Sequence, residues 1–322
     1  MSTAASGGPA DIAGFDAPAS PSVLIGTASW SDRSLIASKR FYPAGVNSPE
    51  ARLRYYASQF PLVEIDTSYY ALPTVASATQ WAARTPPGFT FNIKAFRLFT
   101  GHRTQSAVLP KAIREKLPAQ SDWVYKLMPV TAREALWEAF REALAPLTAA
   151  DKLGAVHFQF APTVVRSDRA LAHLDHVAAR LPGLTIAVEF RHASWFATAQ
   201  ARADTLDFLA ERGFVNVVVD SPQGFQNSVP SVWEATSPEL ALVRLHGRNT
   251  STWNLRGATS ASQRFNYDYS DEELAVMAER VAQLAARAKR THVVFNNNWE
   301  DQGQRNAKTL KGLLGGDVIR WA

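Results

Sequence analysis

Short runs of β-branched and aromatic residues recur along the chain, and most of them alternate with segments that have the 3.6-residue hydrophobic period of a helix. Eight runs predict strands at Val23–Ser29, Leu62–Asp66, Phe89–Ala95, Ala155–Phe160, Thr185–Phe190, Val215–Asp220, Leu242–Leu245 and Thr291–Phe295. Helices are predicted at Ser48–Phe60, Ala76–Arg84, Thr131–Leu144, Asp168–Leu181, Thr198–Arg212, Asp271–Lys289 and Gln304–Leu314. Because repeated strand–helix–strand units give parallel strands, this pattern predicts an α/β fold, the closed (β/α)8 TIM barrel.

Three long segments without clear periodicity follow predicted strands, at Phe96–Val130, Ser221–Glu239 and Asn249–Tyr269. Each occupies the position of a βα loop, and βα loops form the active sites of TIM barrels. We therefore expect one barrel domain over residues 23–322, with long βα loops around its C-terminal mouth. The chain length of 322 residues suits one such barrel with insertions.

Polar residues stand where the interior of a barrel would normally be apolar. Side chains alternate between the two faces of a strand, so Ala187, Glu189 and Arg191 share one face while Ile186 and Val188 share the other. The apolar face must pack on the helices, which directs the polar face into the barrel. The same alternation places polar side chains near the C-terminal ends of other strands, at Glu64, Asp66, Asn92, Lys94, His157, Gln159, Asp220, Arg244, His246 and Asn296.

Buried charges are costly unless they are paired or used, so these residues are the candidate functional site. Glu64, Glu189, Asp220 and His246 are the candidate catalytic residues, because carboxylates and imidazoles can act as general acids, general bases or metal ligands. The candidates for holding a phosphate or carboxylate are cationic: Lys94, Arg191, Arg244 and Arg248. A mutually satisfied network of ion pairs that fills the barrel is the alternative interpretation.

Further candidates for substrate binding lie just beyond the strand ends. Trp30, Tyr69 and Trp195 could stack on a sugar or a base, or could instead cover the core. His192 follows the fifth strand. Asn296 and Asn297 follow the eighth strand and could donate hydrogen bonds to phosphate or ribose, although a plain turn is the alternative.

Composition excludes several classes of site. The chain has no Cys, so disulfides, thiolate catalysis and Cys-ligated metal centres are excluded. Neither a G-x-G-x-x-G fingerprint nor a P-loop is present, and no nucleotide cofactor is expected. A divalent metal remains possible, but the His and carboxylate spacings do not identify its ligands.

The N-terminal segment Met1–Ser22 is rich in Ala, Ser, Gly and Pro and has neither Lys, Arg nor an apolar run. It is predicted to be a disordered tail and not a signal peptide. No stretch approaches 18 apolar residues, so no membrane partner is expected. We expect a cytoplasmic location, and the oligomeric state is open.

The formal net charge of +5 favours anionic partners, which include phosphorylated small molecules and nucleic acid. Between Lys94 and Arg133 there are eight Lys and Arg residues and only two acidic residues, Glu115 and Asp122. This basic segment could face a polyanion or could be a solvated loop.

Several ordered motifs resemble those of the YecE-like family, a domain of unknown function with a TIM-barrel fold. The matching motifs are Gly26-Thr27-Ala28-Ser29-Trp30, Phe41-Tyr42-Pro43, Arg52-Leu53-Arg54-Tyr55-Tyr56, Val63-Glu64-Ile65-Asp66, Ser68-Tyr69-Tyr70, Phe89-Thr90-Phe91-Asn92-Ile93-Lys94, Val188-Glu189-Phe190-Arg191-His192-Ala193-Ser194-Trp195, Val243-Arg244-Leu245-His246-Gly247-Arg248, Phe295-Asn296-Asn297 and Asn306-Ala307. The chain departs from the family pattern at Ala161-Pro162 and over Arg103–Thr131. The resemblance implies the barrel fold and no particular activity.

Three functions are compatible with the sequence. The first is an enzyme, a hydrolase or isomerase and possibly metal-assisted, that acts on a phosphorylated or anionic small molecule at the mouth. The second is a protein that processes or binds nucleic acid. The third is a non-catalytic scaffold that binds a ligand.

Overall fold

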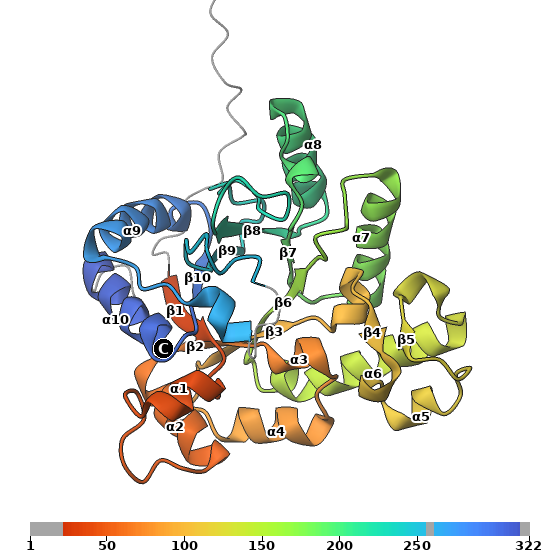
Figure 1. The fold of residues 1–322 in the computed structure, drawn as a ribbon, viewed down its shortest axis with the longest axis horizontal. Coiled ribbons are helices and arrows are strands. Elements are labelled where there is room, and N and C mark those ends of the chain that lie inside the picture. Colours follow the sequence, from red (N-terminus) through yellow and green to blue (C-terminus); the bar gives the residue numbers. More distant parts are fainter. Residues whose placement is uncertain (1–21, 256–260, 316–322) are drawn as a thin grey trace, which may run out of the picture.

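The computed structural model describes residues 22–255 and 261–315. Its centre is a closed barrel of eight parallel strands in the order β1-β10-β9-β8-β7-β6-β3-β2, which confirms the predicted TIM barrel (Figure 1). The barrel strands are β1 (Ser22–Ala28), β2 (Leu62–Ile65), β3 (Thr90–Lys94), β6 (Leu153–Gln159), β7 (Ile186–Glu189), β8 (Val215–Asp220), β9 (Leu240–Leu245) and β10 (Arg290–Phe295). The predicted tail lies outside the described residues except for Ser22, which begins β1.

Helices surround the barrel, as Figure 1 shows. The main ones are α2 (Pro49–Gln59), α4 (Val75–Ala83), α6 (Val130–Ala149), α7 (Asp168–Arg180), α8 (Ala199–Glu211), α9 (Asp271–Ala285) and α10 (Gln302–Leu314). Five begin with a hydroxyl side chain that accepts a backbone N–H of the first turn, a favourable cap, at Ser48, Thr74, Ser167, Thr198 and Ser270. These caps explain why the predicted and observed helix starts agree closely.

Two helices end at positions that differ from the prediction. The helix predicted to end at Leu144 continues as α6 to Ala149, past Pro146. The buried Leu147 continues the apolar face, and a proline in the last turns removes only one hydrogen bond of a long helix. The helix predicted to end at Lys289 stops as α9 at Ala285, and the Lys289 N–H instead bonds the Pro238 carbonyl.

Smaller elements occupy the irregular segments. The segment between β3 and α6 contains η1 (Arg97–Thr100), β4 (Thr104–Gln105), η2 (Ser106–Val108), α5 (Lys111–Arg114), β5 (Asp122–Trp123) and η3 (Tyr125–Leu127). In Figure 1 most of this segment lies on the outer side of the barrel. Other short elements are α1 (Arg33–Ser38), α3 (Thr67–Tyr70), η4 (Ala193–Trp195) and η5 (Ala261–Phe265).

The connection between β8 and β9 contains no helix, as its irregular sequence predicts. Side chains fasten it to the barrel instead. Asn216 Nδ2 donates to the carbonyls of Val232 and Glu234, each at 3.1 Å, and the Ser231 hydroxyl donates to the Val219 carbonyl at 2.6 Å. These bonds satisfy backbone groups that a helix would otherwise pair internally.

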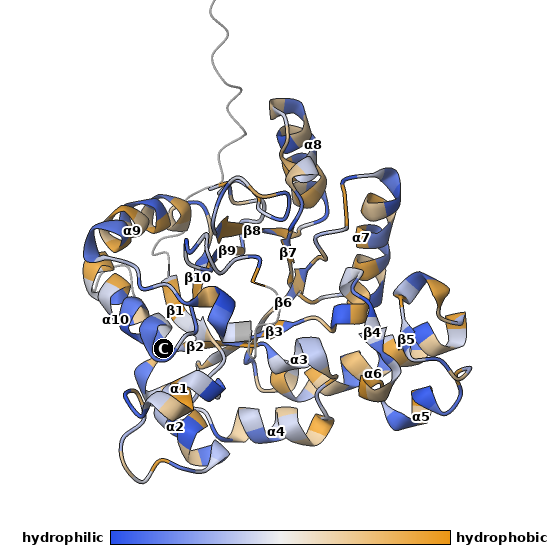
Figure 2. Ribbon diagram, viewed as in Figure 1, coloured by the Kyte–Doolittle hydropathy of each residue, from blue (hydrophilic) through white to orange (hydrophobic). Residues whose placement is uncertain are grey.

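Apolar side chains form two separate cores. The larger core lies between the strands and the helices and includes the outward residues of the strands, such as Val63, Ile93 and Phe158. A small cluster inside the barrel contains Leu24, Ala28, Leu62 and Val294. Figure 2 shows strands such as β8 in hydrophobic colours and the helices in mixed colours. The barrel interior also holds buried polar residues, beside inward apolar residues such as Val219 and Leu242 that belong to the larger core.

Gly26 allows β1 and β2 to approach closely. A Cβ atom at this position would lie 1.9 Å from the Leu62 carbonyl oxygen, which is backbone and cannot move aside without distorting the strand pairing. We expect Gly26→Ala to lower the free energy of unfolding by about 1–3 kcal/mol through overpacking. Gly312→Ala is the control, because nothing lies within 4 Å of a Cβ atom there. Equal stability of the two variants in urea denaturation would contradict the prediction.

Candidate functional site

Strand alternation brings three charged side chains together inside the barrel. Glu64 on β2, Glu189 on β7 and Arg244 on β9 are all fully buried. Arg244 Nη2 donates to Glu64 Oε1 at 2.6 Å, and its Nη1 donates to Glu189 Oε2 at 2.7 Å. Since β9 neighbours neither β2 nor β7, these bonds cross the barrel interior.

His157 on β6 completes this arrangement, although it was not among the predicted catalytic or binding residues. Its Nδ1 lies 3.0 Å from Glu64 Oε2, and its Nε2 lies 3.1 Å from Glu189 Oε2. The sequence placed His157 on the inward face of its strand but gave it no role. We call Glu64, His157, Glu189 and Arg244 the buried network.

The two carboxylates of the buried network are held in their ionised form. Burial raises the pKa of Glu64, but Arg244 and His157 lower it further than burial raises it, so the net pKa lies below its usual value. The pKa of Glu189 is lowered in the same way by Arg244 and His246, against the effect of burial. An ionised carboxylate with paired oxygens is a poor proton acceptor, so the buried network is a fixed set of charges and not a group that transfers protons.

His246, on the segment after β9, lies beside the buried network. Its Nε2 is 3.1 Å from Glu189 Oε1, and its Nδ1 is 2.8 Å from Asn296 Nδ2. Burial lowers the pKa of His246 to about 4, although Glu189 favours the charged form. The neutral ring therefore donates through Nε2 to Glu189 and accepts the Asn296 amide at Nδ1, which uses both nitrogens.

Cations with partial access to solvent lie next to the buried network, at the barrel mouth. Lys94 Nζ is 3.6 Å from Asp66 Oδ1 and 4.8 Å from the centre of the Tyr69 ring. The Arg191 guanidinium lies 4.7 Å from the centre of the Trp253 ring, and its Nη1 is 3.4 Å from Glu189 Oε1. The side chains of Lys94 and Arg191 are 11% and 13% exposed, whereas Arg244 is fully buried.

Two further residues at the mouth were missed as site residues. Arg97, in η1, lies with its guanidinium 5.3 Å from the centre of the Tyr69 ring, and its Nε is buried without a hydrogen-bond partner. Burial, together with Arg97 and Lys94, lowers the pKa of His102 to about 3. The sequence showed Arg97 only as part of the basic segment, because nothing in it indicated that η1 turns back toward the mouth.

Asp66 is the carboxyl group at the mouth edge of the buried network, and its Oδ1 lies 3.9 Å from Arg244 Nη2. Its side chain is 20% exposed, and no hydrogen-bond partner lies at its buried Oδ1. Burial and the neighbouring Glu64 carboxylate raise the pKa of Asp66, while Lys94 and Arg244 oppose that rise. We call Asp66, Tyr69, Lys94, Arg97 and Arg191 the mouth cluster.

Asp220 and Arg248, two of the predicted site residues, lie outside both groups. Asp220 pairs in register with Leu245, so its side chain shares the outward face of the sheet. There it accepts hydrogen bonds from Arg248 Nη2 at 2.9 Å and from the Tyr269 hydroxyl at 2.7 Å. Gly247, at φ +84°, turns the chain and sends Arg248 to this outer side.

Four other predicted site residues make packing contacts or hydrogen bonds with nearby parts of the protein. Trp30 packs edge-on against Trp81, after the positive φ of Ser29 turns it outward. Trp195 is buried and stacks on Phe190 at 3.9 Å. The remaining two bond to nearby loops, His192 to Ser194 and Asn297 to the Tyr267 carbonyl and Asn306.

The described residues were compared with the geometry that a metal site and a membrane-spanning helix require. Over residues 22–255 and 261–315, no group of three or more His, Asp or Glu side chains is arranged to hold a metal ion. Within the same ranges, no helix combines the length and the apolar character needed to cross a membrane.

Comparison with known proteins gives consistent matches over nearly the whole chain. The chain is 31% identical over 294 residues to the UPF0759 protein YunF of Bacillus subtilis (strain 168), covering 91% of this chain and 94% of that protein. It is similar to the crystal structure of a DUF72 family protein, EF0366, from Enterococcus faecalis V583, with a TM-score of 0.74, 29% identity and coverage of 93% and 97%. The DUF72 family protein TM1631 from Thermotoga maritima MSB8 matches with a TM-score of 0.71, 28% identity and coverage of 91% and 99%.

The family described as "Protein of unknown function DUF72" matches residues 24–320. The YecE-like resemblance found in the sequence is consistent with this family. Neither the family description nor the name of YunF specifies an activity or a substrate. The barrel, its strand-end motifs and these matches together show that the chain belongs to the DUF72 family.

Proposed function

We propose that this protein is an enzyme that acts on a phosphorylated or otherwise anionic small molecule, bound by the mouth cluster at the C-terminal end of the barrel. The observation that carries the proposal is the position of Asp66. This partly exposed carboxyl group with a raised pKa lies 3.6 Å from the ammonium of Lys94 and next to the buried network.

Charge supports an anionic ligand. The mouth cluster and the buried network together hold four cations, Lys94, Arg97, Arg191 and Arg244, against the carboxyl groups of Glu64, Asp66 and Glu189. The cations therefore remain in excess even when Asp66 is ionised. Lys94, Arg97 and Arg191 are the cations with some access to solvent, and of these Lys94 and Arg191 would hold the phosphate or carboxylate.

The aromatic residues of the mouth suit the organic part of the same ligand. Tyr69 lies beside Lys94 and Arg97, and Trp253 lies beside Arg191. Burial raises the pKa of Tyr69 to about 12, so its hydroxyl stays protonated at neutral pH. The C–H face of a sugar, or a planar ring, could contact these rings while the anionic group of the ligand is held by the cations.

Asp66 would transfer the proton. A raised pKa brings a carboxyl group nearer to neutral pH, where it can both accept and donate. The buried network would act by positioning. Glu64, Glu189 and Arg244 hold the strand ends, and His246 with Asn296 fixes the segment that follows β9. This arrangement supports a hydrolase or an isomerase that uses general acid–base catalysis.

The test compares wild type with Asp66→Asn in a screen of phosphorylated and carboxylated metabolites followed by mass spectrometry. Wild type is expected to convert one class of metabolite, and Asp66→Asn to do so about 100-fold more slowly or worse, because general acid–base catalysis contributes at least that factor. Lys94→Gln is expected to raise KM for the same substrate. Both variants should keep the melting temperature within a few degrees of wild type.

Asp175→Asn is the matched control. Asp175 in α7 is an exposed carboxylate that pairs with Arg212 and belongs to neither the mouth cluster nor the buried network. It should keep full activity. If Asp66→Asn also kept full activity, the role of Asp66 would be wrong. If wild type bound an anion at the mouth and converted none of the metabolites, the non-catalytic function would replace the enzyme.

A further inference from the structure

A second cavity lies away from the mouth cluster and uses residues that the proposed function does not. It has a volume of about 600 Å³, within the range of small-molecule sites. Four parts of the chain line it: Gly101, the segment around η3, the start of α6 with Arg133, and the residues from Thr163 to His176 in α7. We call it the α6–α7 cavity.

The α6–α7 cavity is positively charged. Lys126, Arg133 and Arg169 line it, and no Asp or Glu does. Among the described residues, none of these three cations has a carboxylate within 4 Å. Three cations around one cavity, none of them in an ion pair, repel one another, and an anion in the cavity would relieve this repulsion. The nearby carboxylate of Glu134, which acts on Tyr125 and His176, pairs instead with Arg180.

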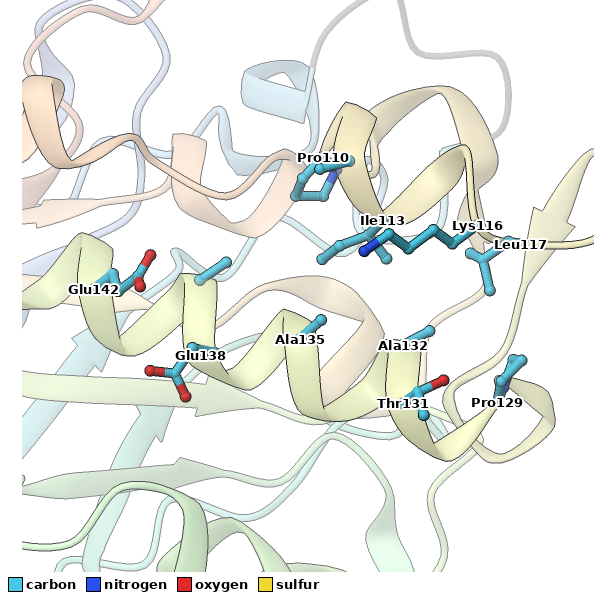
Figure 3. Close-up of a pocket in the computed structure, with 12 residues that line it drawn as sticks. Pro110, Ile113, Lys116, Leu117, Pro129, Thr131, Ala132, Ala135, Glu138 and Glu142 are labelled. Carbon is cyan, nitrogen blue, oxygen red and sulfur yellow. The ribbon is translucent and has the colours of Figure 1, made fainter.

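Another cavity, shown in Figure 3, differs from the α6–α7 cavity in charge. It has a volume of about 370 Å³ and lies between α6 and the segment that contains α5. Glu138 and Glu142 line it together with a single cation, Lys116. The two cavities therefore differ in charge although the same basic segment contributes to both.

Arg133 supplies the clearest sign of a missing partner. Its Nε is buried and has no hydrogen-bond acceptor among the described residues, and its guanidinium lies 5.4 Å from the centre of the Tyr125 ring. A buried donor without an acceptor costs about 1–3 kcal/mol, so such groups are rare without a reason. An anionic ligand would provide the acceptor.

His176 can add a donor to the cavity without adding charge, whereas neutral His173 uses its single N–H for the Phe99 carbonyl. Burial lowers the pKa of both His173 and His176. His176 Nε2 lies 2.7 Å from the Tyr125 hydroxyl, which itself accepts the Trp137 indole N–H at 2.7 Å. When the hydroxyl donates its own proton to Nε2, neutral His176 carries its proton on Nδ1.

We propose that the α6–α7 cavity binds the phosphate group of a small phosphorylated metabolite, at a site separate from the mouth. A phosphate dianion matches three unpaired cations, two of which are arginines that can bind its oxygens in pairs. Tyr125, Val164 and Val165 line the same cavity and would contact the organic part of the ligand. The site is distinct from the proposed catalytic centre and does not depend on it.

The cavity shares one short segment with the mouth. Gly101 lines the cavity, and its neighbour His102 contacts the Tyr69 ring of the mouth cluster at 5.2 Å. His173, which lines the cavity, also bonds the Phe99 carbonyl in η1 at 2.7 Å. A ligand in the cavity would therefore contact the elements that position η1 and, through it, Arg97.

The test measures binding of inorganic phosphate and of adenosine 5′-monophosphate by isothermal titration calorimetry at low ionic strength. The variant Lys126→Gln/Arg169→Gln removes two exposed, unpaired cations and should fold normally. Measured in an Arg191→Gln background, which weakens anion binding at the mouth, these two substitutions are expected to weaken binding of the two probes at least about 10-fold, with adenosine 5′-monophosphate binding more tightly than inorganic phosphate.

The control Lys111→Gln/Lys116→Gln removes the same charge from the same basic segment but not from this cavity, and should bind as wild type does. Arg191→Gln alone should weaken binding at the mouth and retain binding at the α6–α7 cavity. If Arg191→Gln abolished all phosphate binding while Lys126→Gln/Arg169→Gln preserved it, the anion site would be the mouth alone and this inference would fail, leaving the proposed function intact.

Two other results would also overturn the inference. One is a short single-stranded oligonucleotide that binds through Lys126 and Arg169 with steep salt dependence while the two small probes do not bind, which would identify a polymer as the ligand. The other is succinate binding as tightly as phosphate, which would show that the cavity recognises charge without regard to the phosphate group.

Discussion

Replacing Arg244 with methionine is expected to lower the free energy of unfolding by about 3–5 kcal/mol, enough to unfold many proteins of ordinary stability. Arg244 is fully buried and is the cation that bonds both Glu64 and Glu189, at 2.6 and 2.7 Å. Without it, two buried carboxylates face each other across His157 with no strong counterion. Urea denaturation at neutral pH measures the loss.

Two comparisons make this result specific. Arg54→Gln breaks an exposed ion pair with Glu50 and should cost no more than about 1 kcal/mol. Adding Glu64→Gln and Glu189→Gln to Arg244→Met should recover part of the loss, because the variant then buries neutral amides instead of charges. A loss of less than 1 kcal/mol for Arg244→Met would show that the buried network does not hold the barrel together.

Acid is expected to destabilise the protein from about pH 6.5 downward. Burial lowers the pKa of His246 to about 4 and that of His292 to about 3 in the folded protein, while an unfolded histidine titrates near 6.5. Between these values the unfolded chain binds protons that the folded chain does not, so stability falls as the pH falls. The loss should reach several kcal/mol by about pH 4.

The carboxylates extend the same trend to lower pH. The folded pKa values of Glu64 and Glu189 lie below their usual range, so their contribution is complete above about pH 4.5 and is lost as the pH falls further. Unfolding free energies measured from pH 8 to pH 3 would show the two stages.

His292→Leu is the variant that tests the histidine stage. His292 is fully buried, and its Nδ1 lies 3.0 Å from the Asn92 side-chain oxygen. The variant should lose less stability than wild type between pH 6.5 and pH 4. The control Leu62→Met changes a non-titrating side chain of the barrel interior and should shift stability equally at every pH. Parallel profiles for wild type and His292→Leu would contradict the assignment.

The barrel could be predicted from the sequence because its signals are local. Each strand is a short β-branched or aromatic run, and most helices begin at a Ser or Thr cap, so β8 and α7 begin where the pattern predicts. The segment between β3 and α6 could not be predicted in the same way. Its elements are two to four residues long, and their positions depend on tertiary contacts such as that of His173 with the Phe99 carbonyl.

For the candidate site, strand alternation indicated which side chains face into the barrel. The sequence beyond the strand ends did not indicate where its side chains lie. The inward positions Glu64, Lys94, Glu189 and Arg244 do come together. Alternation also accounts for the outward position of Asp220. Its neighbour Val219 pairs with Arg244 and therefore faces inward, so Asp220 faces outward. The turns at Ser29 and Gly247 depend on positive φ values, and these redirect Trp30 and Arg248 in a way that alternation does not reveal.

The Arg244–Glu64 bond also bears on how the protein is made. The two residues are 180 positions apart, and the chain between them supplies His157 and Glu189. During synthesis, every strand up to β8 emerges before the arginine that neutralises the interior. An incomplete chain would have to bury two carboxylates without their cation, which is unfavourable. We therefore expect the barrel interior to close only once β9 has been translated, so that truncated chains remain open to proteolysis while complete chains fold.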